Sequence, residues 1–205
     1  MSQKDANELH YRYYREYGLA IEGLVRHHKV DALEYNSKVD DALPLDEVIK
    51  PNPELRKLIE DIDTSKVRLW LFTNAYITHG KRVVKLLKID DLFEGITYCD
   101  YGSDKFYCKP HAEMYEKAMA EAGIKSNDKC YFVGMRYWNI HIVEETLMKW
   151  SDDSYINCKA AEERGWKTAH LLDEKDAAPA QQASKYQIRS LQELRKIFPE
   201  VFKSS

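Results

Sequence analysis

Apolar residues along this chain fall into two patterns, short continuous runs and longer stretches in which they recur every three or four positions. The first pattern is typical of strands that are buried on both faces, and the second is typical of amphipathic helices. The short runs predict strands at residues 69–72, 96–99, 130–133, 168–172 and 186–188. Helical patterns separate the first four runs, a polar loop separates the last two, and a further helical pattern over residues 191–201 predicts a closing helix. We therefore expect an α/β fold built on a parallel sheet.

The first 50 residues predict helices and no strand. Apolar and aromatic residues recur at helical spacing over residues 9–25, and Gly18 and Gly23 predict a break or bend in that helix. A linker rich in proline follows near residue 50. We therefore divide the chain into a helical segment, residues 1–50, and an α/β unit, residues 51–205.

Composition and charge narrow the class of protein. The chain has 205 residues, of which 44% are hydrophobic, which is enough for one sizeable core. A net charge of -3 gives no electrostatic footprint for nucleic acid or for an anionic membrane. The 4 cysteines show no paired metal-ligand spacing, and no signal peptide or long apolar run accompanies them. We expect reduced thiols and a cytoplasmic location, with the nucleus left open; the sequence does not indicate the oligomeric state.

The strand at residues 69–72 ends in polar groups that are candidates for a binding site. Thr73 and Asn74 follow it directly, and ligands of open α/β sheets bind beyond the carboxyl ends of the strands. A hydroxyl and an amide at that place can hydrogen-bond an anionic oxygen. The alternative is an ordinary turn in which Thr73 or Asn74 caps the next helix, and the strand alone favours this alternative.

Lys109 is a second candidate for binding an anion. Pro110 follows it at the predicted start of a helix, which holds the lysine in extended backbone at the helix entrance. From there the ammonium group can reach a ligand beyond the sheet. Taken alone, such a lysine is an ordinary surface charge.

An acidic motif at residues 61–64, with the sequence DIDT, lies before the strand at 69–72. It looks like the DxDxT signature of phosphatases that use an aspartate nucleophile. In those enzymes the signature follows a buried strand, whereas here Asp61 and Asp63 follow a helical pattern. The motif therefore lies at the opposite end of the sheet from Thr73, and we expect a solvated helix terminus.

Three segments carry a resemblance to a known family. Residues 71–74 (LFTN), 108–110 (CKP) and 152–161 (DDSYINCKAA) resemble, in order and context, the second, third and fourth motifs of haloacid dehalogenase-superfamily phosphatases. Residues 17–20 (YGLA) and 92–101 (LFEGITYCDY) are similar to the pyrimidine 5′-nucleotidase branch. The resemblance implies a Rossmann-like parallel sheet with a helical cap. It also implies a small-molecule partner, a nucleoside monophosphate such as UMP or CMP.

The resemblance further implies a mechanism for phosphoryl transfer. In the family an aspartate attacks the phosphoryl group, and a second aspartate two residues later acts as acid and base. By their places in the motifs, Thr73 and Asn74 would bind phosphoryl oxygens. Lys109 would offset negative charge on the nucleophile and on the transferring group, which makes Thr73 and Lys109 the catalytic candidates.

A Mg²⁺ cofactor is implied in the same way. Asp152 and Asp153 would hold the ion through carboxylate oxygens, which are the ligands that this hard cation prefers. Asn157, one helical turn further on, would help to orient the loop that carries them.

The family's DxDxT strand has no counterpart at the expected place in this chain. In the family that strand precedes the cap and lies in the centre of the sheet, whereas this sequence begins inside the cap. Without it, the strands at 69–72 and 131–133 would face an empty slot with unpaired backbone groups. We therefore expect a sheet that lacks its central strand, low stability and no phosphatase turnover. The alternatives are a non-catalytic binding or regulatory protein of the superfamily, and an unrelated α/β ligand-binding protein.

Residues 134–151 are a second departure from the family pattern. They separate the strand that ends at Val133 from the aspartates that should follow it, at a place where connections are normally very short. Their removal would join Val133 to Asp152 and restore the pattern. Two origins stay open, a translated intron and a true helical insertion, and the rarity of long connections at such places favours the intron.

Overall fold

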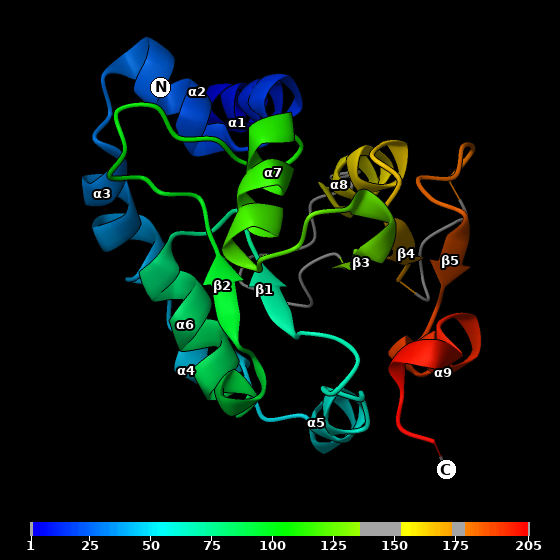
Figure 1. Cartoon of the computed structure of the whole chain (residues 1–205). Helices are drawn as coiled ribbons and strands as arrows, with labels where there is room; N and C mark the ends of the chain where they lie inside the picture. The colour runs from blue at the N-terminus through cyan, green and yellow to red at the C-terminus, as the bar shows by residue number, and fades with distance from the viewer. Residues whose placement is uncertain (1, 136–152, 174–178, 205) are drawn as a thin grey trace.

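The computed structural model describes residues 2–135, 153–173 and 179–204. The strands are β1 (Trp70–Phe72), β2 (Gly95–Thr97), β3 (Tyr131–Met135), β4 (Lys167–Leu171) and β5 (Tyr186–Ile188). The helices are α1 (Gln3–Tyr17), α2 (Ala20–His28), α3 (Ala32–Tyr35), α4 (Leu45–Val48), α5 (Pro53–Glu60), α6 (Ile77–Leu86), α7 (Ala112–Glu121), α8 (Asp153–Glu163) and α9 (Leu194–Ile197). Helices and strands alternate from α5 to β4, as the sequence predicts (Figure 1).

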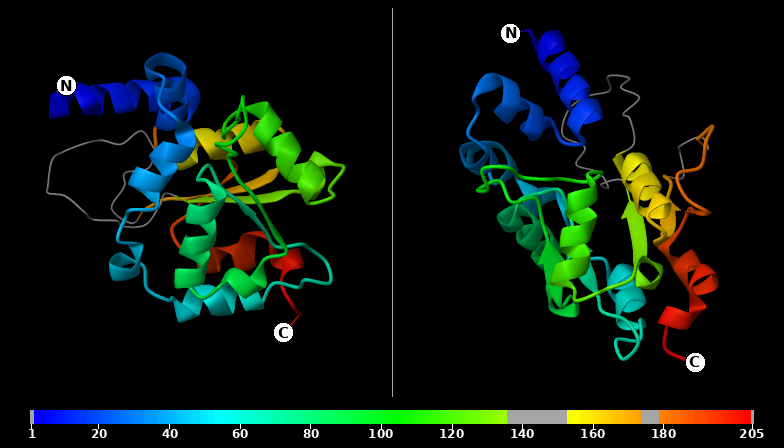
Figure 2. Two further views of the ribbon diagram at one scale, coloured as in Figure 1. Left: turned by 90° about the vertical axis from the view of Figure 1, so that its left-hand side faces the viewer. Right: turned by 45° about the horizontal axis from the view of Figure 1, so that its top comes forward.

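The strands form two parallel sheets. β1 pairs with β2 in one sheet, and the other has the order β3-β4-β5. The two sheets lie side by side, with β1 and β3 as the neighbouring edges (Figures 1 and 2). The predicted α/β fold with parallel strands is confirmed. Its interruption between β1 and β3 lies where a central strand was expected to be missing.

The neighbouring edges of β1 and β3 carry backbone groups that point into the gap between them. On β1, the Thr73 N–H donates to the end of β2 at 3.0 Å, so strand alternation turns the backbone polar groups of Phe72 toward β3. On β3, the Cys130 carbonyl accepts from the start of β4 at 2.8 Å, which turns those of Tyr131 and Val133 toward β1. The two edges thus direct backbone N–H and C=O groups toward each other, and no strand of the described residues lies between them.

Aromatic side chains cross this gap. The Phe72 ring centroid lies 6.0 Å from that of Phe132, 5.2 Å from that of Tyr115 and 6.1 Å from that of Trp166. Phe132, Tyr115 and Trp166 are buried, and Phe72 packs against their cluster. Side-chain packing therefore joins the two sheets in one core where backbone pairing does not.

Helices cover both faces of the β3-β4-β5 sheet. On one face, Ala169 and Leu171 of β4 pack with Leu58 of α5 and with residues of the C-terminal segment. On the other face, Phe132 of β3 packs with Ala161 of α8 and with α7. Successive side chains of a strand point to opposite faces, so β3 contributes to both clusters, with Tyr131 and Val133 on the first face and Phe132 on the second. A third cluster packs α2 against the loop that follows β2.

The predicted bend at Gly18 is confirmed, and the predicted break at Gly23 is wrong. Gly18 ends α1 with φ 79°, a left-handed conformation that glycine adopts without strain. α2 runs through Gly23 without interruption. A Cβ atom at Gly23 would lie 2.1 Å from Cγ of Tyr13. The glycine therefore allows α2 to pack closely on α1.

The predicted closing helix over residues 191–201 is broken into short pieces. α9 is flanked by 3₁₀ turns at Leu191–Glu193 and Pro199–Val201. Pro199 has no backbone N–H to continue an α-helical ladder, so the helix ends before it. The apolar residues Leu194, Phe198 and Val201 are buried nevertheless.

The acidic motif at 61–64 lies at the amino end of β1, as predicted. Asp61 follows the last residue of α5 and pairs with Lys57 and Arg195, each at 2.6 Å. Asp63 accepts a hydrogen bond from the Ser65 hydroxyl at 2.6 Å. These carboxylates stabilise a helix end and a turn, away from the Thr73 end of the strand.

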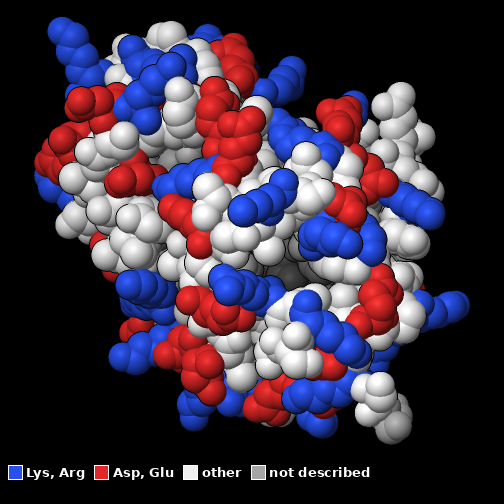
Figure 3. Space-filling model, viewed as in Figure 1, with Lys and Arg blue, Asp and Glu red and all other residues white. Residues whose placement is uncertain are grey.

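Acidic and basic side chains are mixed on the face of the molecule in Figure 3, without a large patch of one sign. Among the helices of the described residues, none combines the length and the apolar character that crossing a bilayer requires. Of the predicted insertion, Gly134 and Met135 belong to β3. Residues 136–151 lie outside the described residues, as does Asp152.

Candidate functional site

Lys109 is the centre of the candidate site. It precedes α7, and the residue is only 8% exposed. Its Nζ donates to the Phe72 carbonyl at 2.7 Å, one of the backbone groups that β1 turns toward β3. Nζ also lies 4.5 Å from the ring centroid of Phe72 and 5.6 Å from that of Phe132. The ammonium group therefore lies between the two sheets, at the carboxyl end of β1.

Asn74 holds the backbone of Lys109 in place. The Lys109 N–H donates to Asn74 Oδ1 at 2.7 Å, and Asn74 Nδ2 donates to the Lys109 carbonyl at 2.9 Å. This reciprocal pair fixes the lysine beside the end of β1. The geometry gives Asn74 a positioning role, and its predicted contact with phosphate stays a prediction.

The electrostatic environment of Lys109 favours binding of an anion. Burial lowers the pKa of its ammonium group to about 8, against an ordinary 10.5, and the neighbouring thiols of Cys158 and Cys108 act in the opposite direction. Among the described residues, no carboxylate contributes to this environment. Among those residues, its partners are one carbonyl and two aromatic faces. A phosphoryl or carboxylate oxygen placed there would offset the desolvation of the charge.

Thr73 lies at the end of β1, as predicted. Its Oγ1 accepts a hydrogen bond from the Ala75 N–H at 3.0 Å, which fixes the side chain in the turn. The N-cap of α6 is Tyr76, so the alternative in which Thr73 or Asn74 caps the next helix is wrong. The hydroxyl proton of Thr73 can still be donated to an anionic oxygen beyond the strand.

The predicted metal ligands are only partly described. α8 begins at Asp153, whose side chain lies outside the described part of the structure together with Asp152. Asn157 is buried in the second turn of α8, and its carbonyl accepts from the Tyr115 hydroxyl at 2.8 Å. Its Oδ1 is buried and has no hydrogen-bond partner among the described residues. The start of α8 thus presents one unsatisfied amide oxygen.

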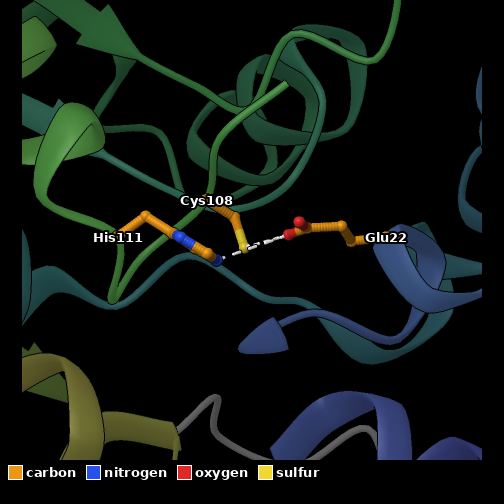
Figure 4. Close-up of side chains that lie close together, drawn as sticks. All are labelled: Glu22, Cys108 and His111. Carbon is orange, nitrogen blue, oxygen red and sulfur yellow. Dashed lines mark hydrogen bonds and ion pairs between the residues drawn. The ribbon is translucent and has the colours of Figure 1, made fainter. Parts of the chain in front are cut away.

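One group of chemically capable residues was not predicted from the sequence. Glu22 of α2 converges with Cys108 and His111, which lie on either side of Lys109 in the chain (Figure 4). One sequence signal was available, because Glu22 lies among the apolar residues 20, 21, 24 and 25 of a predicted helix. In the structure, residues 20–23 are buried. A carboxylate in such a position needs partners.

Comparison by sequence places the chain in a family. The family model described as haloacid dehalogenase-like hydrolase matches residues 3–140. The chain is also similar to Phosphate metabolism protein 8 of Saccharomyces cerevisiae, with 41% identity over 137 residues. That match covers 63% of this chain and 43% of the yeast protein, so the chain spans less than half the length of this relative.

Solved structures share the fold at low sequence identity. A dehalogenase with an intermediate complex aligns with a TM-score of 0.56 and 18% identity, over 94% of this chain and 89% of that one. A HAD phosphatase from Thermococcus onnurineus aligns with a TM-score of 0.54 and 15% identity, over 93% and 86% of the two chains. These matches agree with the fold, and the family model, which matches more than half of the chain, shows that the chain belongs to the haloacid dehalogenase-like hydrolases.

Proposed function

We propose that this chain supplies the phosphate-binding part of a Mg²⁺-dependent phosphatase site for nucleoside 5′-monophosphates such as UMP and CMP. The observation that carries the proposal is the buried ammonium group of Lys109, which has no carboxylate beside it among the described residues. It lies at the carboxyl end of a parallel strand, where ligands of such sheets bind. The name of the yeast relative, which refers to phosphate metabolism, supports a phosphorylated substrate.

The nucleophile in this proposal is an aspartate on an extended segment that fills the gap between β1 and β3. Its carboxylate oxygen attacks phosphorus, the ester P–O bond breaks, and the leaving nucleoside oxygen takes a proton from a neighbouring acid. Water then attacks the acyl phosphate, which releases inorganic phosphate and restores the carboxylate. No described residue of this chain occupies that place, so we propose that the chain by itself does not turn over.

The residues at the end of β1 act on the charge that develops during transfer. Lys109 neutralises the carboxylate nucleophile and the transferring phosphoryl group, and Thr73 donates its hydroxyl proton to a phosphoryl oxygen. Asn74 keeps Lys109 in position through the two hydrogen bonds to its backbone. All three groups are held on strand ends or by backbone contacts, which suits electrostatic preorganisation.

The buried and unsatisfied Oδ1 of Asn157 is an oxygen of the kind that Mg²⁺ prefers, and the sequence supplies two carboxylates shortly before it, Asp152 and Asp153. Asp152 and Asp153 would hold the ion, with Asn157 orienting their loop. Bound Mg²⁺ supplies charge neutralisation for the phosphoryl group.

We assign residues 1–50 as a cap segment and residues 51–205 as the α/β unit, with an insertion at 134–151. We propose the cytoplasm as the location of the protein.

A gain-of-function experiment tests the proposal. An apolar strand that ends in Asp-Xaa-Asp is fused to the N-terminus through a flexible linker, and Mg²⁺-dependent release of phosphate from UMP and CMP is measured. The unfused chain is expected to release none. The fusion is expected to turn over, and a matched fusion with Asn in place of the first Asp is not. A folded fusion without turnover would contradict the proposal.

A second arm tests the acidic motif at 61–64. Turnover by the unfused chain that is lost in Asp61→Asn or Asp63→Asn would move the nucleophile to that motif. Turnover that survives both substitutions would place the nucleophile elsewhere in this chain. Either result would overturn the assignment of the gap as the place of the missing carboxylate.

The edges of β1 and β3 that have no strand partner among the described residues favour a second candidate function, non-catalytic binding. Two strand edges that face a common gap can take up an extended peptide by backbone pairing. In that case the Asp and Asn fusions would both stabilise the fold, and neither would release phosphate. Calorimetric binding of UMP without turnover would select a ligand-binding or regulatory protein of the same superfamily.

A further inference from the structure

Three side chains from distant parts of the chain converge beside the Lys109 segment. Glu22 comes from α2, and Cys108 and His111 come from the segment that leads into α7 (Figure 4). Glu22 Oε2 lies 3.5 Å from Cys108 Sγ and 3.6 Å from His111 Nε2. One ligand atom from each residue lies within 4.8 Å of the others. The cluster thus combines a carboxylate, a thiol and an imidazole.

A backbone oxygen provides a fourth donor at the same point. The Tyr17 carbonyl lies 3.2 Å from Cys108 Sγ and 3.2 Å from His111 Nε2. Zn²⁺ binds sulfur at about 2.3 Å and nitrogen or oxygen at about 2.0–2.2 Å, so its tetrahedral ligands are roughly 3.3–3.6 Å apart. Four of the six separations among these donors lie between 3.2 and 3.6 Å, which agrees with this spacing within a few tenths of an ångström. Cys108 Sγ and His111 Nε2 lie within 4.8 Å of each other.

The surroundings hold the donors in place. Glu22 is 3% exposed and Cys108 is 0% exposed. The other carboxylate oxygen of Glu22 accepts a hydrogen bond from Arg26, which leaves Oε2 directed at the thiol and the imidazole. Partners of this kind orient metal ligands and restrict their movement. The set is therefore pre-organised before any ion arrives.

We propose that Glu22, Cys108, His111 and the Tyr17 carbonyl bind one Zn²⁺ ion in a closed, structural site. Sulfur and imidazole nitrogen select zinc over Mg²⁺ or Ca²⁺, which prefer oxygen ligands alone. Four protein donors leave no open position for substrate, which is typical of a structural site. The ion would join α1 and α2 to the segment that holds Lys109. The proposal is independent of the phosphatase proposal, because no step of that chemistry uses it.

Binding of zinc by Cys108 requires that its thiol lose a proton. Burial, with Cys99 and Glu22 adding to it, raises the pKa of the Cys108 thiol, so zinc would have to displace a proton from that sulfur. In the absence of zinc the same atoms form a hydrogen-bond network, in which the thiol donates to the Tyr17 carbonyl. The experiment must therefore separate a metal site from this network.

Cobalt substitution makes that separation. The full chain is stripped of metal with a chelator and titrated with Co²⁺, then with Zn²⁺ in competition. One equivalent of Co²⁺ is expected, with the absorption bands of a tetrahedral site and a thiolate-to-metal charge-transfer band. Zn²⁺ is expected to remove these bands and to raise the melting temperature. A spectrum without these bands, or no stoichiometric binding of either ion, would overturn the proposal and leave the hydrogen-bond network only.

Variants identify the ligands. Cys108→Ser is expected to abolish the charge-transfer band, and His111→Gln, at a half-buried position, to weaken Zn²⁺ binding by at least about tenfold. Cys130→Ser, which alters a half-buried thiol outside the cluster, is the matched control and is expected to bind as the parent does. Circular dichroism confirms that each variant is folded. An unchanged cobalt spectrum in folded Cys108→Ser would refute the site.

Discussion

This molecule contains two buried charges of opposite sign, Glu22 and Lys109, and their partners differ. The Glu22 carboxylate has a guanidinium, an imidazole and a thiol around it. Among the described residues, the Lys109 ammonium has one carbonyl and two aromatic faces as partners, and no carboxylate. Partners make a buried charge tolerable in a core, whereas a buried charge without a counter-ion is typical of a functional site. The contrast distinguishes a structural cluster from a site that awaits an anion.

The largest expected effect is on catalysis at Lys109. In the fusion that completes the sheet, Lys109→Met and Thr73→Ala are each expected to lower kcat by about 10²-fold or more, because both groups act on transition-state charge. Steady-state kinetics with UMP measures the change. Lys105→Met is the control, since Lys105 is an exposed lysine of the same loop. A loss of activity that only follows a loss of stability would assign both residues a structural role.

The same substitution at Lys109 should have the opposite effect on stability. The pKa of Lys109 is about 8 in the folded chain against an ordinary 10.5, so between these values the unfolded chain binds more protons. Stability therefore rises with pH through this window in the parent, and the charged lysine costs about 3 kcal/mol below it. Lys109→Met removes that dependence and should be the more stable protein at pH 7.

Urea unfolding of both proteins between pH 7 and pH 10.5 checks this prediction. The advantage of Lys109→Met should shrink toward zero as the pH rises to that of an ordinary lysine. Other titrating tyrosines and cysteines are the same in both proteins, so they cancel in the difference. A difference that does not vary with pH would mean that Lys109 is neither desolvated nor charged as described.

A smaller effect is expected at Asn74. Asn74→Ala leaves the N–H and the carbonyl of Lys109 without their partners at 2.7 and 2.9 Å, which should cost about 1–3 kcal/mol of unfolding free energy. The control is Asn7→Ala, which removes one exposed contact with Gln3. Asn74→Asp keeps the acceptor for the Lys109 N–H and should recover part of the loss. Equal stability of the alanine and parent proteins would argue against the positioning role.

The smallest effect is expected at the partnered charge. Arg26 is half exposed, and Glu22 keeps His111 when Arg26 is replaced. Arg26→Gln should therefore cost about 1 kcal/mol or less, and the cost should decrease in high salt. Thermal unfolding at two ionic strengths measures it, with Lys4→Gln of an exposed pair as the reference. A cost of several kcal/mol would show that Glu22 depends on this one partner.

The sequence predicted the positions of the strands well because each lies in a short apolar run. β5 agrees with the prediction at both ends. The break at Gly23 was wrong because a glycine can relieve a packing contact, here with Tyr13, without breaking a helix. The closing helix was wrong because its apolar spacing continues across Pro199, where the backbone ladder does not. The local apolar pattern thus predicts which residues are buried more reliably than it predicts whether a helix is continuous.

The candidate site was predictable only in part. Lys109 could be placed at the helix entrance because Pro110 fixes the backbone on either side of the peptide bond. Its contact with Phe72, 37 positions away, could not be predicted, because only the folded sheet brings them together. The same reason hid the cluster of Glu22 with Cys108, which are 86 positions apart. A site formed by residues that are far apart in the sequence has no characteristic spacing along the chain, so it cannot be recognised from the sequence alone.

The facing edges of β1 and β3 also affect the behaviour of the chain in concentrated solution. Each copy presents backbone donors and acceptors in strand geometry, and such edges recruit strands from other molecules. Both edges border one gap, so an extended segment of a second copy can pair with both of them, while the gap of that second copy can take a segment of a third, which permits growth without closure. Purification at high concentration should therefore yield soluble oligomers and precipitate, and the fusion that covers both edges should remain monodisperse in light scattering.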